Sequence, residues 1–200
     1  MAIRQPQPPP RLRRSTDDDD WSEFHGVAMS EEQFLDLDDR EETDLEYIDG
    51  IAYCKAVVDE DHRDLSGEFD YRFGSYRRLA GGSFGPEFRV RMRSGRHQKP
   101  DAGFWRKGTP ATKGSLPTVA VEVRSRSETM EEQRRNCRLY RDAGVPVVWL
   151  VDPVGRVVEV FDDGHDDAPL PRDGVLTTAL MPGFALPVAE LFAVLDRETG

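Results

Sequence analysis

Two acidic residues stand where a charged side chain is costly to bury. Glu122 lies inside the apolar run 119–123, and Asp101 follows a proline and leads into a second apolar run. A buried carboxylate has to be compensated by a cationic side chain or by a metal ion. A neighbouring arginine is the commoner compensation for a lone glutamate, but two such carboxylates are also the ligands that a divalent cation uses in hydrolytic sites. These residues alone leave both explanations open.

The segment that contains both carboxylates is rich in basic side chains. Lysine and arginine outnumber aspartate and glutamate between Arg89 and Arg141, although the whole chain has a net charge of −11. Arg89, Arg91 and Arg93 alternate with apolar residues and would present three cations on one face of a strand. Such a face suits contacts to phosphates and favours a nucleic-acid partner. The alternative is that these arginines are solvated or pair with the acidic remainder of the chain.

The elements that must position these residues alternate between strand and helix patterns. Strand patterns cover residues 45–48, 51–58, 88–93, 101–105, 118–123, 147–151, 156–161 and 175–180, and helical patterns cover 30–37, 62–79, 128–143 and 186–195. Residues 162–174 read as a polar loop. The strand–helix–strand unit in 118–151 implies a right-handed parallel crossover, and hairpins at both ends imply antiparallel neighbours. The sequence therefore predicts an α/β fold with one central mixed β-sheet flanked by helices.

Length and composition suit a single domain with a tail. Residues 1–28, rich in proline, arginine and aspartate, are predicted to be a disordered N-terminal tail, and residues 29–200 to be the domain. There is no run of about 18 apolar residues, so we expect no membrane span, and the N-terminus lacks the apolar region of a secretory signal. Cys54 and Cys137 form no CxxC motif, which favours reduced thiols and a cytoplasmic location over a structural zinc site.

Several motifs occur in the order and spacing of a known family. They are YIDG at 47–50, KPDAGFW at 99–105, VAVEVRSRS at 119–127, LYRDAGVPVVWLVDP at 139–153 and the closing MPGFALPVAELF at 181–192. In these motifs the chain resembles the Uma family of restriction-endonuclease-like proteins, within the PD-(D/E)xK nuclease superfamily, over about residues 29–192. The resemblance implies a restriction-endonuclease-like fold and metal-dependent hydrolysis of phosphodiester bonds in DNA.

The resemblance also implies roles for the acidic residues. Asp101 and Glu122, on neighbouring strands, would bind Mg²⁺ or Mn²⁺, hard cations that take oxygen ligands and activate water. Glu46 matches the family's upstream acidic position, where it would bind a second cation or orient the water. The alternative for Glu46 is an exposed acid of the hairpin around Asp49 and Gly50.

The basic member of the implied site departs from the family pattern. The superfamily usually has a lysine two residues beyond the glutamate, and this position is Arg124 here. Uma-type proteins more often have it four residues before the tyrosine that matches Tyr140, and this position is Asn136. Arg124 would hold a phosphate and stabilise developing negative charge, with Arg135 as an outside candidate for the same contact. Arginine stays protonated and cannot readily serve as a proton-transferring base.

Other residues are candidates for substrate contact. His62 falls where the family often has a histidine at the start of its long helix, and Gln98 precedes the PD motif and could line the cleft. Each has a structural alternative, as an exposed helix-start histidine and a loop residue. The remaining candidates for phosphate or substrate contact are Arg89, Arg91, Arg135 and Asn136.

Two functions follow from the sequence. The first is a cytoplasmic, metal-dependent DNA endonuclease with Glu46, Asp101, Glu122 and Arg124 as catalytic residues. The second is a catalytically degenerate nuclease fold that binds nucleic acid or a protein partner, which the missing lysine motivates. A homodimer would suit the cutting of both DNA strands, and the sequence leaves the oligomeric state open.

Overall fold

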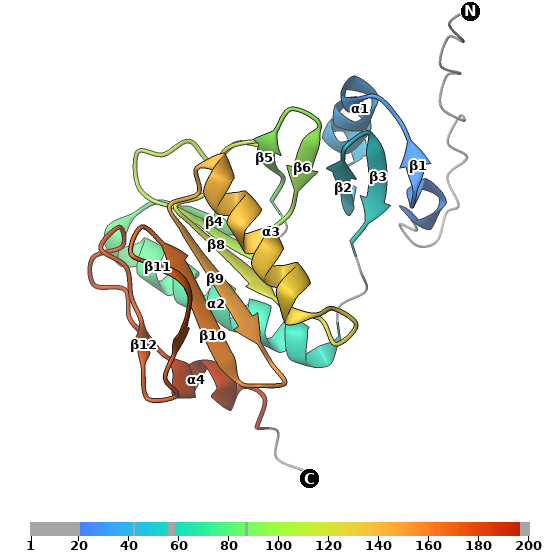
Figure 1. Ribbon diagram of the computed structural model, residues 1–200. Coiled ribbons are helices and arrows are strands. Elements are labelled where there is room, and N and C mark those ends of the chain that lie inside the picture. The colour runs from blue at the N-terminus through green and yellow to red at the C-terminus, as the bar shows by residue number, and fades with distance from the viewer. Residues whose placement is uncertain (1–20, 42, 56–58, 87, 197–200) are drawn as a thin grey trace, which may run out of the picture.

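A six-stranded mixed sheet forms the centre of the fold, in the order β11-β10-β9-β8-β7-β4 (Figure 1). The computed structural model describes residues 21–41, 43–55, 59–86 and 88–196. The six strands are β4 (Ser83–Gly85), β7 (Ala102–Trp105), β8 (Val119–Val123), β9 (Val147–Asp152), β10 (Val157–Asp162) and β11 (His165–Leu170). Strands β8 and β9 run parallel, and the other neighbours are antiparallel. This is the central mixed sheet that the sequence predicted.

Helices cover both faces of this sheet. They are α2 (Glu60–Ala80), α3 (Met130–Ala143) and α4 (Val188–Ala193). Helix α1 (Glu31–Glu41) lies outside this sheet, where its Phe34 packs against Leu45 and Tyr47, and a 3-10 turn, η1, spans Trp21–Phe24. Helix α3 packs Cys137 and Tyr140 on one face, in a core shared with Ala120. Helices α2 and α4 pack on the other face, in a core shared with Val121. Because side chains alternate along a strand, Glu122 lies on the α3 face together with Ala120.

The crossover helix α3 begins and ends where its sequence specifies. Thr129 and Glu132 form a reciprocal capping box, in which each side chain accepts a hydrogen bond from the other residue's backbone N–H. Gly144 ends the helix in the left-handed conformation with φ of 102°, which glycine adopts without the steric penalty of a side chain. The helix is thereby fixed over the strand that holds Glu122.

A second sheet of five antiparallel strands lies beside the first, in the order β1-β3-β2-β6-β5. Its strands are β1 (Val27–Ala28), β2 (Leu45–Ile48), β3 (Ile51–Cys54), β5 (Val90–Arg93) and β6 (Arg96–Gln98). A separate two-stranded sheet pairs β12 (Val175–Leu176) with β13 (Leu186–Pro187). The β2–β3 turn has positive φ at both Asp49 and Gly50, as the tight turn that suits a twisted hairpin requires. The prediction of one sheet is therefore corrected to two main sheets, because the second has a core of its own that contains Phe34, Leu45 and Tyr47.

Two further expectations are corrected. The sequence predicts that residues 21–28 belong to the tail, but Phe24 is buried and β1 pairs with β3. Residues 1–20, the rest of the predicted tail, lie outside the described part of the chain. The predicted loop 162–174 contains β11, which pairs with β10 at the edge of the central sheet. A polar edge strand is hard to recognise from its sequence because it lacks an apolar alternation. In the described part of the chain, no helix has the length and apolarity to cross a membrane.

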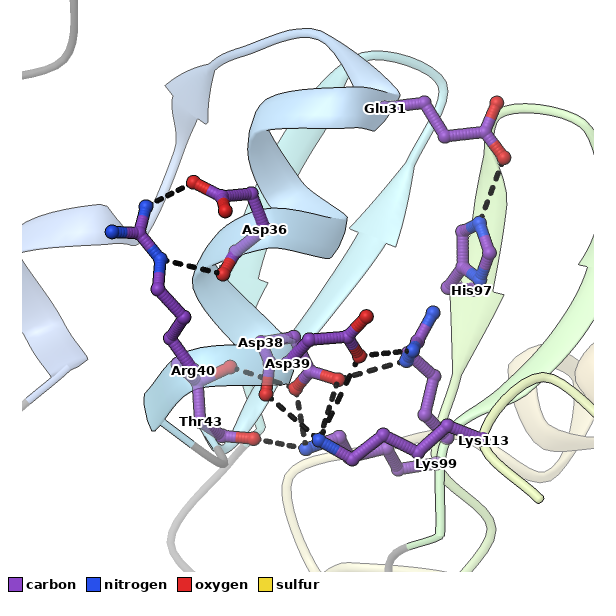
Figure 2. Close-up of polar contacts among 10 residues, drawn as sticks. Glu31, Asp36, Asp38, Asp39, Arg40, Thr43, His97, Lys99 and Lys113 are labelled. Carbon is purple, nitrogen blue, oxygen red and sulfur yellow. Dashed lines mark hydrogen bonds and ion pairs between the residues drawn. The ribbon is translucent and has the colours of Figure 1, made fainter.

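A buried ionic cluster joins α1 to the segment that leads into β7 (Figure 2). Asp38 is only 1% exposed, and its carboxylate lies 2.8 Å from Arg89 Nε and 3.2 Å from Lys99 Nζ. The hydroxyl of Thr43 donates a third contact to it at 3.0 Å, and Lys113 Nζ donates to the Asp38 backbone carbonyl at 2.9 Å. Lys99 is thus fixed through its side chain, two residues before Asp101 on the same chain segment.

Candidate functional site

Three carboxylates line one cavity of about 240 Å³ between the two sheets. Glu46 comes from β2, Asp101 immediately precedes β7, and Glu122 comes from β8. The Asp101 backbone N–H donates to the Val121 carbonyl at 3.0 Å, which continues the β7–β8 ladder and sets Asp101 beside Glu122. Glu46 Oε1 accepts a hydrogen bond from the Lys99 backbone N–H at 2.9 Å. The fold therefore brings together the three acidic residues that the sequence singled out.

Asp101 is held by three donors. Lys55 Nζ lies 2.6 Å from Oδ1, His62 Nε2 lies 3.0 Å from Oδ2, and the Val123 backbone N–H donates to Oδ2 at 2.7 Å. Burial alone would raise the pKa of this carboxyl group, but Lys55 and His62 outweigh it and lower the pKa to about 2. Asp101 is therefore an oriented anion at neutral pH.

Glu122 has the opposite environment. Its side chain is 7% exposed, and among the described residues its Oε1 makes no hydrogen bond of ordinary geometry, although the buried Tyr140 phenol lies beside this carboxyl group. Burial and the nearby charge of Asp101 raise its pKa well above the ordinary value. Glu122 in turn raises the pKa of the buried Tyr140 phenol beside it, after the larger effect of burial. Burial likewise raises the pKa of Glu46. Without a bound cation, the cavity therefore disfavours the ionised form of two of its three carboxyl groups.

This donor set suits a hard divalent cation. Within the described residues, no group of three or more His, Cys, Asp or Glu side chains is arranged to hold a metal ion. Mg²⁺ does not need such a cage, because it is commonly bound through one or two carboxylates together with water and substrate phosphate. Asp101 and Glu122 would supply those two carboxylates, and a cation there would lower the pKa of Glu122, which burial and then the charge of Asp101 raise.

Lys55 is the site residue that the sequence analysis missed. It directly follows β3, where its backbone N–H donates to the Asp44 carbonyl at 3.0 Å. The signal was present in the hairpin: Tyr53 pairs directly with Glu46, and Lys55 is two residues further along. Side chains on one strand face repeat every two residues, so Lys55 shares the face of Glu46.

Arg124 lies outside the cavity. Its guanidinium contacts Asp152 Oδ1 through Nη2 at 2.6 Å and through Nε at 3.0 Å, and its Nη1 donates to the Glu128 carbonyl at 3.0 Å. Arg124 follows the last residue of β8, and its side chain is drawn to the end of β9 rather than toward Glu122. The Arg124 backbone N–H still donates to the Val151 carbonyl at 2.9 Å, so it is the ion pair with Asp152 that directs the guanidinium away from Glu122.

The remaining candidates separate into two groups. His62 and Asn136 line the cavity, and the Gln98 side chain donates to Asn136 Oδ1 at 2.8 Å. Arg135 is exposed on α3, next to Asn136 in the sequence. Arg89 is 7% exposed and belongs to the Asp38 cluster, so it does not share an exposed face with its neighbours.

The predicted basic strand face is largely neutralised. Arg91 lies 3.6 Å from Glu31, and Arg93 pairs with Asp49. Further basic residues of the same region pair with acidic ones: Arg126 with Asp61, Arg134 with Glu159, and Arg141 with Asp163. The alternative stated for these arginines, pairing with the acidic remainder, describes most of them.

Comparisons with known proteins agree with the resemblance seen in the sequence. The chain matches the Uma2 family, described as "Putative restriction endonuclease", over residues 31–189. It is similar to the crystal structure of "a putative nuclease belonging to DUF820 from Anabaena variabilis", with a TM-score of 0.70 and 18% identity over 84% of this chain and 99% of that chain. A similarity to the DrdV–DNA complex has a TM-score of 0.36 and 11% identity, over 56% of this chain and 11% of that chain.

The comparison with curated proteins found no match. The solved DUF820 structure, at its low sequence identity, supports the restriction-endonuclease-like fold. The family match spans most of the chain and includes Glu46, Asp101 and Glu122. The chain therefore belongs to the Uma2 family.

Proposed function

We propose that this protein is a DNA endonuclease that depends on Mg²⁺ or Mn²⁺. The observation that supports this most is the buried Glu122 Oε1, which lacks a hydrogen-bond partner among the described residues and stands in one cavity with the ionised Asp101. A buried, unsatisfied carboxylate oxygen is costly unless a ligand completes its coordination. A divalent cation bound there would lower the pKa of an attacking water and offset phosphate charge.

The residues of the chain would divide the work as follows. Asp101 and Glu122 would hold the cation, and the His62 side chain and the Val123 backbone N–H orient Asp101 for this role. Glu46, held by the Lys99 backbone N–H, would orient water or support a second cation. A site that is already held in place avoids reorganisation at the moment of reaction.

Substrate contact is proposed for the residues beside the cavity on the α3 side. Asn136 lines the cavity and is oriented by Gln98, and Arg135 is exposed on the same helix. An exposed guanidinium is well suited to a phosphate oxygen. The cytoplasm is the proposed location, since the two cysteines of the chain, Cys54 and Cys137, form no CxxC motif and are far apart in the sequence. A homodimer would place two such sites on opposite DNA strands.

The first test is calorimetric binding of Mn²⁺, with and without a short DNA duplex, together with cleavage of that duplex. Asp101→Ala should abolish both Mn²⁺ binding and cleavage, because it removes the ionised ligand, while the circular dichroism spectrum stays unchanged. Asp142→Ala is the matched control, since Asp142 is an exposed carboxylate on α3 that does not line the cavity. Cleavage that survives Asp101→Ala would rule out this assignment.

A second function has specific support. Neither expected lysine position has a lysine, and Lys55 already forms an ion pair with Asp101. These features would also fit a nuclease fold that binds nucleic acid without cutting it. DNA binding that is independent of Mn²⁺, with no Mn²⁺ bound by the wild-type protein, would favour this alternative.

A further inference from the structure

We propose that Lys55 supplies the cationic group that the expected lysine positions lack, and that it contacts the scissile phosphate while a metal ion is bound to Asp101. This inference rests on the proposed nuclease function. Lys55 would stabilise the negative charge that develops on the phosphate oxygens. It comes from the end of β3 in the second sheet, far in sequence from both expected positions.

The geometry places this ammonium group within the candidate site. Lys55 Nζ lies 2.6 Å from Asp101 Oδ1, and Lys55 lines the same cavity as Glu46 and Glu122. Its side chain is 16% exposed, compared with 3% for Asp101. Lys55 is thus more accessible than the carboxylate that it contacts, as a residue that meets a substrate from the mouth of the cavity has to be.

Other cations are excluded from this role by their positions. Among the described residues that line the cavity, Lys55 is the only lysine or arginine. Arg124, the residue at the superfamily's usual position, has its guanidinium committed to Asp152 and to the Glu128 carbonyl. Asn136, at the other position, is an uncharged amide that accepts a hydrogen bond from Gln98. The cavity therefore receives its fixed positive charge from the second sheet.

The present contact between Lys55 and Asp101 has a consequence for metal binding. Lys55 Nζ already contacts Asp101 Oδ1 at 2.6 Å, and two cations on one carboxylate oxygen repel each other. The lysine side chain has four rotatable methylene groups, so its ammonium can move by several ångströms while the backbone stays paired with Asp44. Lys55 thus opposes cation binding and favours the chemical step.

These opposite effects provide the test. Lys55→Gln should bind Mn²⁺ at least as tightly as the wild type in calorimetry, and several-fold more tightly if the ammonium competes directly. The same variant should lose about 100-fold or more in kcat for cleavage, the range seen when one charge-stabilising group is removed. A residue with a merely structural role would weaken both properties together. Lys107→Gln is the matched control, because Lys107 is exposed and lies outside the cavity.

A rescue variant strengthens the test. Adding Asn136→Lys to Lys55→Gln would return a lysine to the cavity from α3, and at least a tenfold recovery of kcat is expected. Unchanged cleavage in Lys55→Gln, under conditions where Asp101→Ala abolishes it, would overturn this proposal and leave the nuclease assignment standing. If the wild type binds Mn²⁺ but does not cut, weaker Mn²⁺ binding by Lys55→Gln overturns the proposal. Absence of Mn²⁺ binding in both the wild type and Lys55→Gln overturns this proposal and the nuclease assignment together.

Discussion

Asp101 and Glu122 are adjacent carboxyl groups with opposite ionisation behaviour. Asp101 has two cationic or potentially cationic partners and a backbone donor, whereas Glu122 has a buried oxygen without a partner among the described residues. The difference comes from the second sheet and from the start of α2, which supply Lys55 and His62 as direct partners of Asp101. Neighbouring acids with divergent pKa values are typical of functional sites, although structural ion pairs also produce them.

The acidic residues of the site could be predicted from the sequence, whereas its basic residue, Lys55, could not. Glu122 was recognisable because a charge within an apolar strand has to be compensated. Arg124 was misleading because a spacing of two along the chain does not reveal a competing partner, and Asp152 at the end of β9 takes its guanidinium. Predicting Lys55 requires the register of the β2–β3 hairpin, in which Glu46 pairs with Tyr53. That register follows from the position of the turn at Asp49.

Asp70 yields a prediction about stability and pH. It lies on α2, its Oδ1 is buried without a hydrogen-bond partner among the described residues, and burial raises its pKa from 3.8 to about 6. The folded protein then binds more protons than the unfolded chain between these values, so stability falls as pH rises from about 4 to 6. Asp70→Asn should raise the free energy of unfolding at pH 7 by about 1 kcal/mol, after allowance for partial exposure, and by almost nothing at pH 3.5.

Urea denaturation at both pH values measures this effect, with Asp142→Asn as an exposed control that should change stability by less than about 0.5 kcal/mol. An equal gain from Asp70→Asn at both pH values would show that ionisation is not the cause.

The secondary elements differ in how clearly their sequences specified them. The bounds of β2, Leu45–Ile48, were predicted directly, because the Asp-Gly turn fixes the hairpin. Helix α3 was marked by its capping residues and by Gly144. The separation of the strands into two sheets was not predicted, since periodicity identifies a strand without identifying its neighbours. Strand β11 was missed because its sequence is too polar to resemble a strand.

The contact between α1 and the segment before β7 depends on Asp38. This carboxylate is buried among Arg89, Lys99 and Thr43, so its loss would leave buried cations uncompensated. Asp38→Asn should lower the free energy of unfolding by about 3–5 kcal/mol. Asp36→Asn is a matched control on the same helix, because its pair with Arg40 is 61–68% exposed and should be worth less than about 1 kcal/mol. Guanidinium denaturation compares the two variants. Similar losses in both would contradict the importance of burial here.

The charge distribution of the whole molecule limits how it can bind DNA. The net charge is −11, and most arginines of the basic region are paired with acidic residues. Few cations are then left to displace counterions from a duplex. We expect about two or three phosphate contacts, so a plot of the logarithm of the DNA-binding constant against the logarithm of the salt concentration should have a slope no steeper than about −3. Fluorescence anisotropy between 50 and 200 mM salt gives this slope, and a slope near −6 would show that the ion pairs open to meet DNA.

The cavity between the two sheets has a consequence for how its geometry is lost. Glu46 and Lys55 come from one sheet, Asp101 and Glu122 from the other, and each sheet has its own apolar core. A small relative displacement of the sheets would separate these four side chains while leaving both cores intact. The arrangement of the cavity would therefore be lost under mild heat or denaturant before either core melts, because it depends on the junction of the sheets rather than on the resistance of either half to unfolding.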